Sequence, residues 1–412
     1  MKNISKWQYI SALLGNLFEH YDKALFSFLS PFLATILFPD KEPVVALLLT
    51  YSMIPLGMLA RPVGSLIFGY IGDTRGRKQA LFLSLGGMGV LSLLIACIPT
   101  YGQMGVIIPV LFCLARVLQN FFAAGETMGG AIFLLEKAKE NKQDILSSIY
   151  NSSTIAGILL ASGAISFLTF CDFIEGGWRL LFVIGFITAV FGLIIRKKLP
   201  EEKEEKTSFP TNLGKLFWNY KRPLFTIMIT SGFSYANYSV ALVLINGFMP
   251  LVSTITKAQM IHINTALLVL DLLALPLFGY LSSKISREKM MLLASLGVVF
   301  LAMPLFSFLP DGSMFAVIMV RIVLVLLGVA FSASYHAWAK QMIPKEHRYT
   351  LISFGYATGS QLLGGSTAAI SLWIYHETGL VSSVCWYWMG LALACSLTLL
   401  FLQKPALVKK AV

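Results

Sequence analysis

The sequence predicts an all-α membrane protein with about 12 transmembrane helices, arranged as two pseudo-symmetric six-helix bundles. Hydrophobic residues make up 57% of the 412 positions and charged residues only 13%, whereas soluble domains carry roughly 25% charged residues. The mean hydropathy is +0.75. The apolar positions form about 12 runs near the ~20 residues that one membrane crossing needs. Because lipid offers the backbone no hydrogen bonds, these runs are expected to be helices.

A polar segment separates the runs into two sets. The first set covers residues 8–38, 44–70, 80–98, 104–125, 148–171 and 178–195. The second set covers residues 223–248, 259–281, 290–309, 314–339, 350–375 and 382–402. The segment 196–222 between them is rich in lysine and glutamate, which is typical of a solvated linker. We therefore predict an N-terminal bundle in residues 1–195, a cytoplasmic linker in 196–222 and a C-terminal bundle in 223–412.

Positive charge is distributed unequally between the two sides of the predicted membrane. Of the 32 Lys and Arg residues, 4 lie deep within the runs, and 3 (Lys41, Arg179 and Lys257) lie in loops or at the end of a run on one side. The other 25 (32 − 4 − 3) lie on the opposite side. Since the cytoplasmic side of membrane proteins is the positive one, we expect both termini in the cytoplasm and the chain in the inner membrane. The net charge of +12 reflects this topology, so nucleic acid is not an expected partner.

The two halves contain matching segments. GYIGDTRGRK at 69–78 follows the second run, and GYLSSKISRE at 279–288 follows the eighth, 210 residues later (279 − 69). Arg116 in the fourth run and Arg321 in the tenth are 205 residues apart (321 − 116). Repeats of this kind place a substrate site near the middle of the membrane, between the two halves.

Glu19, Asp22 and Lys23 interrupt the apolar first run. Ionisable side chains inside a membrane are costly, and they mark substrate or proton pathways. Asp22, with Glu19, is our first choice for proton coupling, since burial favours the protonated form of a carboxylate. Lys23 follows Glu19 at the spacing of a helix ion pair, so Lys23 either neutralises Glu19 or contacts substrate. Alternatively, Asp22 holds an arginine of a neighbouring helix.

Arg116 and Gln119 lie one turn apart on one face of the fourth run. A guanidinium offers a planar fork for a carboxylate, and an amide adds a neutral donor or acceptor. We predict that this pair binds a carboxylate of the substrate. The alternative is a structural salt bridge from Arg116 to Asp22 or Glu126.

The second half offers fewer polar residues. Arg321 either contributes to the substrate site or pairs with Asp271 of the eighth run. Further candidates for the cavity wall are Tyr235, Asn237, Tyr238, Tyr356 and Gln361. Aromatic rings suit a quaternary ammonium group through cation–π contact, while ordinary packing is the alternative role for each ring.

No Walker sequence, GxGxxG turn or HExxH motif occurs in the chain, and its five cysteines show no CxxC spacing. ATP-driven transport, a metal site and an enzymatic activity are therefore not expected. No cofactor is predicted, and the proton gradient is the expected driving force.

Three segments resemble the major facilitator superfamily, in particular its metabolite–proton symporter branch of proline/betaine, citrate, oxoglutarate and shikimate carriers. They are GNLFEHYD at 15–22, RPVGSLIFGYIGDTRGRK at 61–78 and RVLQNFFAAGETMG at 116–129. The resemblance implies that Glu19 and Asp22 are the acids of the first helix. It also implies a gate at the inner side, formed by Asp73 and Arg77 with Glu126.

These features predict proton-coupled uptake of a small carboxylate-bearing metabolite or zwitterionic osmolyte by alternating access, with a monomer as the expected unit. An uncoupled facilitator or exchanger of the same metabolites is the alternative. Lys23 favours that alternative, because a nearby cation holds a carboxylate in its charged form. A membrane sensor or receptor is a more distant alternative, since the loops are short and no soluble signalling segment is evident.

Overall fold

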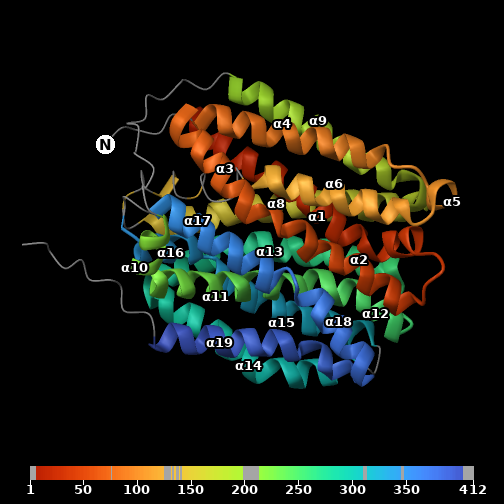
Figure 1. The fold of residues 1–412 in the computed structure, drawn as a ribbon. Helices are drawn as coiled ribbons and strands as arrows, with labels where there is room; N and C mark the ends of the chain where they lie inside the picture. Colours follow the sequence, from red (N-terminus) through yellow and green to blue (C-terminus); the bar gives the residue numbers. More distant parts are fainter. Residues whose placement is uncertain are drawn as a thin grey trace, which may run out of the picture.

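A computed structural model describes residues 6–75, 77–124, 131, 134, 135, 139, 142–197, 213–309, 313–344 and 348–401. Within these ranges every regular element is helical. The long helices run roughly parallel, with those of the first half in the upper part of Figure 1 and most of those of the second half below them. The all-α fold class that hydropathy predicts is confirmed.

The first half crosses the bundle repeatedly. Its first pass is α1 (Lys6–Leu37), and its second is α2 (Pro43–Met58) followed by α3 (Ala60–Arg75). The later helices of this half are α4 (Arg77–Ala96), the short α5 (Tyr101–Met104), α6 (Ile107–Ala123), α8 (Gln143–Phe170) and α9 (Ile174–Lys197).

The second half contains three interrupted passes. One combines α11 (Lys221–Tyr238), the π-helical turn η2 (Ser239–Leu244) and α12 (Ile245–Val252). Another combines α15 (Met314–Ser332) and α16 (Tyr335–Met342), and a third combines α17 (Arg348–Thr358), the π-helical turn η4 (Gly359–Gly364) and α18 (Thr367–Thr378). The remaining elements are α13 (Lys257–Ile285), α14 (Arg287–Ser307), the 3₁₀ turn η5 (Val381–Cys385) and α19 (Trp386–Phe401).

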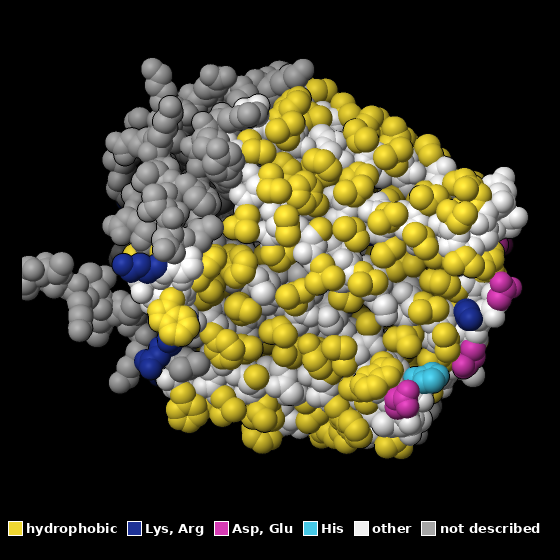
Figure 2. Space-filling model, viewed as in Figure 1, with side chains coloured by type: hydrophobic (Ala, Val, Ile, Leu, Met, Phe, Trp, Pro, Cys, Tyr) yellow, Lys and Arg dark blue, Asp and Glu magenta, His cyan; other side chains and the backbone are white. Residues whose placement is uncertain are grey.

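The helices have the length and apolarity of membrane spans. Among the described residues, 8 helices are long and apolar enough to cross a membrane, and Phe82–Ala96 and Ile107–Ala123 are shorter apolar helices. α1 is 32 residues long but carries Glu19, Asp22 and Lys23 within it. Figure 2 shows a broad band of apolar side chains between two charged edges, with Lys and Arg at the left edge and Asp and Glu, together with a basic side chain, at the right edge. This is the surface of a multi-pass membrane protein.

We call the two ends of the helix bundle the Lys6 end and the Leu37 end, after the first and last residues of α1. The Lys6 end is on the left side of Figure 1. The short helix α10 (Leu213–Asn219) falls within the predicted linker 196–222. Residues 198–212 of that linker lie outside the described residues.

Helix α8 packs against α1 within the first half and against α13 of the second half. Glycines permit both close approaches. A Cβ atom at Gly157 would lie 2.1 Å from the carbonyl oxygen of Leu17, and one at Gly279 would lie 2.4 Å from Oγ of Ser148. α8 therefore joins the central helix of the first half to the second half.

Candidate functional site

A cavity of about 120 Å³ lies between the two halves of the bundle. The first half contributes α1 and α8 to its wall, and the second half contributes α11, η2, α13, α15 and α17. Charged, amide and aromatic side chains line it, among them Lys23, Tyr235, Asn237, Tyr238, Asp271 and Tyr356. Five of these six residues are among those that the sequence singles out for the substrate site. The volume suffices for several water molecules or a compact organic solute.

Lys23 faces the cavity from α1. Its ammonium nitrogen lies 4.6 Å from the ring centroid of Tyr235 on α11, a cation–π arrangement that joins the two halves. No ion pair within 4 Å links Lys23 to Glu19 in the described part of the chain. The helix ion pair that the spacing suggests is therefore not formed, and Lys23 points toward the second half instead.

The partner of Glu19 is Arg61, on the neighbouring helix α3. Arg61 Nη2 donates to Glu19 Oε1 at 2.9 Å, and each side chain is only 1% exposed. Glu19 Oε2 and Arg61 Nε and Nη1 are buried, and no described residue forms a hydrogen bond with them. Lys23 is the only partner that the sequence suggests for Glu19, so sequence reasoning misses this pair. The available signal is that Arg61 lies inside an apolar run, where an ionisable residue needs a partner.

Asp22 belongs to a second buried network, which includes side chains of α4 and α6. Ser92 Oγ donates to Asp22 Oδ1 at 2.7 Å, and Gln119 Nε2 donates to Asp22 Oδ2 and, at 2.8 Å, to Ser92 Oγ. Asp22 is 4% exposed. Gly185 of α9 leaves the carboxylate room, because a Cβ atom there would lie 2.8 Å from Asp22 Oδ1.

Arg116 extends this network at its far end. Arg116 Nη1 donates to Gln119 Oε1, and the guanidinium carbon lies 4.8 Å from the ring centroid of Phe26. Gln119 therefore stands between Arg116 and Asp22. Arg116 and Gln119 share a face, as their spacing predicts, but neither lines the cavity in this arrangement.

Asp271 is the carboxylate of the cavity wall contributed by α13. It is 8% exposed. Among the described residues, none forms a hydrogen bond or an ion pair with it. Arg321, its possible partner by sequence, instead donates to the carbonyl oxygen of Ala241 at 2.9 Å and to Asn264 Oδ1.

Two other sequence candidates lie away from the cavity. Arg321 is fully buried, and its Nη1 has no hydrogen-bond partner. Gln361 is also fully buried in η4, where its Nε2 donates to Ser360 Oγ at 2.9 Å. Asn237, in contrast, reaches the cavity while its amide donates to the carbonyl oxygen of Leu324 at 3.2 Å.

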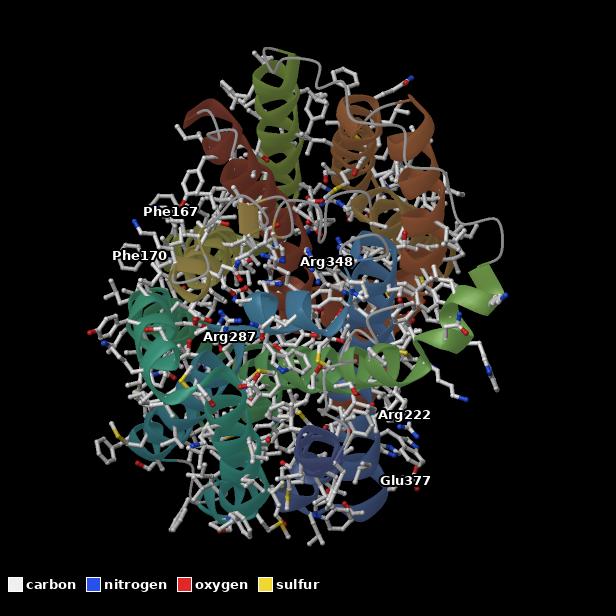
Figure 3. The ribbon with its side chains drawn as sticks, turned by 90° about the vertical axis from the view of Figure 1, so that its left-hand side faces the viewer. Phe167, Phe170, Arg222, Arg287, Arg348 and Glu377 are labelled. Atoms are coloured by element: carbon white, nitrogen blue, oxygen red, sulfur yellow. The ribbon has the colours of Figure 1, made fainter. Side chains whose placement is uncertain are left out.

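The predicted gate lies largely outside the described part of the structure. The backbones of Asp73 and Arg77 belong to α3 and α4, but their side chains, and all of Glu126, are not among the described residues. A different pair joins the halves at the Lys6 end, where Arg287 binds Asp144. These residues line a second, open hollow of about 710 Å³. Figure 3 looks from this end and shows Arg287 and Arg348 between the upper and lower helices.

Asn151 of α8 closes the cavity toward the Lys6 end. Its Nδ2 donates to the carbonyl oxygen of Ser332 at 2.6 Å, where α15 ends, and its Oδ1 lies 2.9 Å from Nε2 of His336 on α16. Toward the Leu37 end, Tyr51 Oη donates to the carbonyl oxygen of Val243 at 2.8 Å. Polar contacts therefore join the halves on both sides of the cavity.

A cavity with charged and aromatic side chains between two helical halves of a multi-pass membrane protein is typical of a transporter. Comparisons with known proteins agree. A family model described as "Sugar (and other) transporter" matches residues 8–204, and one described as "Major Facilitator Superfamily" matches residues 224–411. The chain belongs to the major facilitator superfamily and is a multi-pass inner-membrane protein.

Its relatives carry small polar metabolites. The alpha-ketoglutarate permease of Escherichia coli is 32% identical, over 97% of this chain and 94% of the relative. The glycine betaine/proline/ectoine/pipecolic acid transporter of Dickeya dadantii is 25% identical, over 96% of this chain and 83% of the relative.

Solved structures share the fold. The D-xylose-proton symporter superposes with a TM-score of 0.73 at 17% identity, covering 96% of this chain and 97% of that chain. The human organic anion transporter MFSD10 superposes with a TM-score of 0.69 at 13% identity, covering 97% and 100%.

Proposed function

We propose that this protein performs proton-coupled uptake of a small carboxylate-bearing metabolite or zwitterionic osmolyte by alternating access. The observation that carries the proposal is the cavity between the halves, where the Lys23 ammonium faces aromatic rings. Asp22, which precedes Lys23 on α1, lies in the buried hydrogen-bond network with Ser92 and Gln119. A change in the cavity can therefore reach Asp22 through α1, which is what coupling requires.

The proposed roles follow from these positions. Asp22, with Glu19, takes part in proton coupling, and Lys23 meets the substrate carboxylate first. Arg116 and Gln119 join the substrate site only if the Asp22 network opens. The rings of Tyr235, Tyr238 and Tyr356 form the aromatic wall with Asn237, while Arg321 and Gln361 contribute after rearrangement of the second half.

The remaining proposals concern the gate and the topology. Asp73, Arg77 and Glu126 form the gate on the cytoplasmic side, which corresponds to the Lys6 end. Both termini are cytoplasmic, in line with the positive-inside rule and with the charges at the two edges of Figure 2. We propose a monomer as the transporting unit.

Uptake into proteoliposomes tests the coupling. Radiolabelled glycine betaine, L-proline and alpha-ketoglutarate are offered separately to vesicles with an alkaline interior, and protein-free vesicles serve as the control. We expect accumulation of at least one compound above the external concentration, and its collapse on addition of a protonophore. Accumulation that ignores the protonophore would exclude proton symport.

One observation favours the alternative of an uncoupled facilitator or exchanger. Glu19 already holds Arg61, and Asp22 already accepts hydrogen bonds from Ser92 and Gln119, so both acids have partners in the absence of a proton. Such a carrier would show counterflow of labelled substrate without any response to a pH gradient.

A further inference from the structure

Two charged side chains of opposite sign face the cavity, and in the described part of the chain neither has an ion-pair partner within 4 Å. Lys23 comes from α1 of the first half, and Asp271 comes from α13 of the second half. In the described part of the chain, Lys23 contacts only the ring of Tyr235 among the groups that bind a cation. Nothing there donates to the Asp271 carboxylate, and no ion pair within 4 Å joins the two residues to each other.

The two charges also lie at the same depth. Lys23 is 14 residues from the end of α1 at Leu37 (37 − 23), and Asp271 is 14 residues from the start of α13 at Lys257 (271 − 257). Both of these helix termini are at the Leu37 end. With a rise of 1.5 Å per residue, each side chain starts ~21 Å from that end. The cavity therefore presents a cation from the first half and a carboxylate from the second half, both near the middle of the membrane.

Neighbouring groups relieve these charges only in part. Glu19 is paired with Arg61, and Asp22 accepts hydrogen bonds from Ser92 and Gln119. Glu19 attracts the Lys23 ammonium from beyond ion-pair distance, while Arg61 and Arg116 repel it. Arg321, the partner that the sequence suggests for Asp271, instead donates to Asn264 Oδ1 and to the Ala241 carbonyl oxygen. A charge held inside the membrane without a close partner is costly. A bound molecule that supplies both missing partners would remove both costs.

We propose that Asp271 determines the specificity of the cavity by selecting ligands that carry a cationic group, so that the site takes a compact zwitterion. This inference rests on the proposed transport function and narrows its substrate class. The ligand carboxylate pairs with Lys23, and its ammonium or quaternary ammonium group lies at Asp271 beside the ring of Tyr238, which also lines the cavity. A dicarboxylate places its second negative charge near Asp271 and is disfavoured.

Matched pairs of compounds isolate the cationic group. Glycine betaine and 3,3-dimethylbutanoate have nearly the same shape, but a carbon atom replaces the quaternary nitrogen in the second. L-Proline and cyclopentanecarboxylate form a second pair, and alpha-ketoglutarate is the dianion probe. Binding of each compound to the purified full-length protein is measured by the shift of its melting temperature and by titration calorimetry.

We expect the wild-type protein to bind at least one zwitterion at least about tenfold more tightly than its carbon isostere, because removing one partner of a buried charge pair costs more than 1.4 kcal/mol, which corresponds to a factor of ten. Asp271→Asn should abolish this preference, with the zwitterion weakened and the isostere retained or strengthened. Asp172→Asn is the matched control. It removes an exposed loop carboxylate at a position with φ 53°, which asparagine tolerates, and it should leave the preference unchanged.

Three results would overturn the inference: equal binding of zwitterion and isostere by the wild type, tighter binding of alpha-ketoglutarate than of every zwitterion, or an unchanged preference in Asp271→Asn. The proposed function fails by a different readout, since it concerns gradient-driven accumulation. A protein that accumulates a dicarboxylate with protons would refute the role of Asp271 and leave the symport proposal standing.

Discussion

Asp144 of α8 and Arg287 of α14 join the two halves of the protein through a two-point contact at the Lys6 end. Arg287 Nε lies 2.5 Å from Asp144 Oδ1, and Nη2 lies 3.1 Å from Oδ2. The Asp144 side chain is 9% exposed and the Arg287 side chain is 12% exposed. A guanidinium and a carboxylate in this parallel geometry form a strong and directional pair, so its rupture must accompany opening at this end.

Removing the pair should open the Lys6 end more often. Arg287→Ala leaves Asp144 unpaired at the interface, and a loss of one to two kcal/mol shifts the equilibrium about 5–30-fold. The measurement is the maleimide labelling rate of a cysteine placed at Ser282, a buried residue that lines the second hollow, in a variant lacking the native cysteines. Lys284→Ala, which removes an exposed cation nearby, should leave the rate unchanged.

The same contact can be tested by exchange of its charges. The double variant Asp144→Arg with Arg287→Asp should bring the labelling rate back toward that of the parent protein. If the exchanged pair labels as fast as Arg287→Ala, the contact does not control opening at this end.

The Glu19–Arg61 pair should dominate the stability of the first half. Arg61→Met leaves an uncompensated carboxylate among buried side chains, which costs about 3–5 kcal/mol. The double variant Glu19→Gln with Arg61→Met carries no unpaired charge and should recover most of the loss. Melting of detergent-solubilised protein, followed by size-exclusion chromatography, measures both. A double variant as unstable as the single one would show that the pair does not act as a unit.

Asp22→Asn should separate coupling from binding. The amide has nearly the same shape and still accepts the hydrogen bond from Ser92, but its NH2 group then faces the Gln119 amide donor. The fold should therefore persist with some loss of stability. Without a titratable group at this position, gradient-driven accumulation should fall to the level of protein-free vesicles, while counterflow of labelled substrate continues. Asp172→Asn should accumulate normally. Full accumulation by Asp22→Asn would remove Asp22 from the coupling mechanism.

The close approach of α1 and α8 can be tested with two glycines of one helix. Gly157→Ala forces a methyl group into the backbone of α1, and overpacking of this kind costs about 1–3 kcal/mol. At Gly163, an added Cβ meets nothing within 4 Å, so Gly163→Ala should be neutral or stabilise by up to about 1 kcal/mol through helix propensity. Equal melting temperatures for the two variants would contradict this description of the contact.

Proton symport of a zwitterion moves one net positive charge per cycle. An inside-negative potential of 100 mV supplies ~2.3 kcal/mol for that charge, enough for roughly 50-fold accumulation. A potassium diffusion potential, set with valinomycin at equal pH on both sides, should therefore drive uptake of the preferred zwitterion. A dianion carried with one proton would be expelled by the same potential, so the sign of the response identifies the transported charge.

The fold could be predicted from the sequence because membrane spans are properties of single segments. Hydropathy and length place each helix without knowledge of its neighbours. The face shared by Arg116 and Gln119 could also be predicted, since residues three apart meet on one helix. Sequence patterns do not identify an ion-pair or hydrogen-bond partner that lies on a second helix.

Partners across helices were not accessible to the same argument. Local spacing favours a pair between Glu19 and Lys23, but Arg61 lies 42 residues from Glu19 in the chain and offers a guanidinium from α3. Likewise, Arg321 donates to Asn264 Oδ1 and to the Ala241 carbonyl oxygen, and not to Asp271. Tertiary packing determines which candidate residue becomes the partner. The sequence shows the candidates but not how they pack.

The equal depth of Lys23 and Asp271 has an electrical consequence. A ligand held between them sits near the midpoint of the voltage drop, so each half of the transport cycle moves its charge through about half of the membrane field. Each half then receives roughly 1.2 kcal/mol per 100 mV for one charge. Loading from outside and release inside would share the work of the membrane potential almost evenly, and neither step alone would set the voltage sensitivity of the cycle.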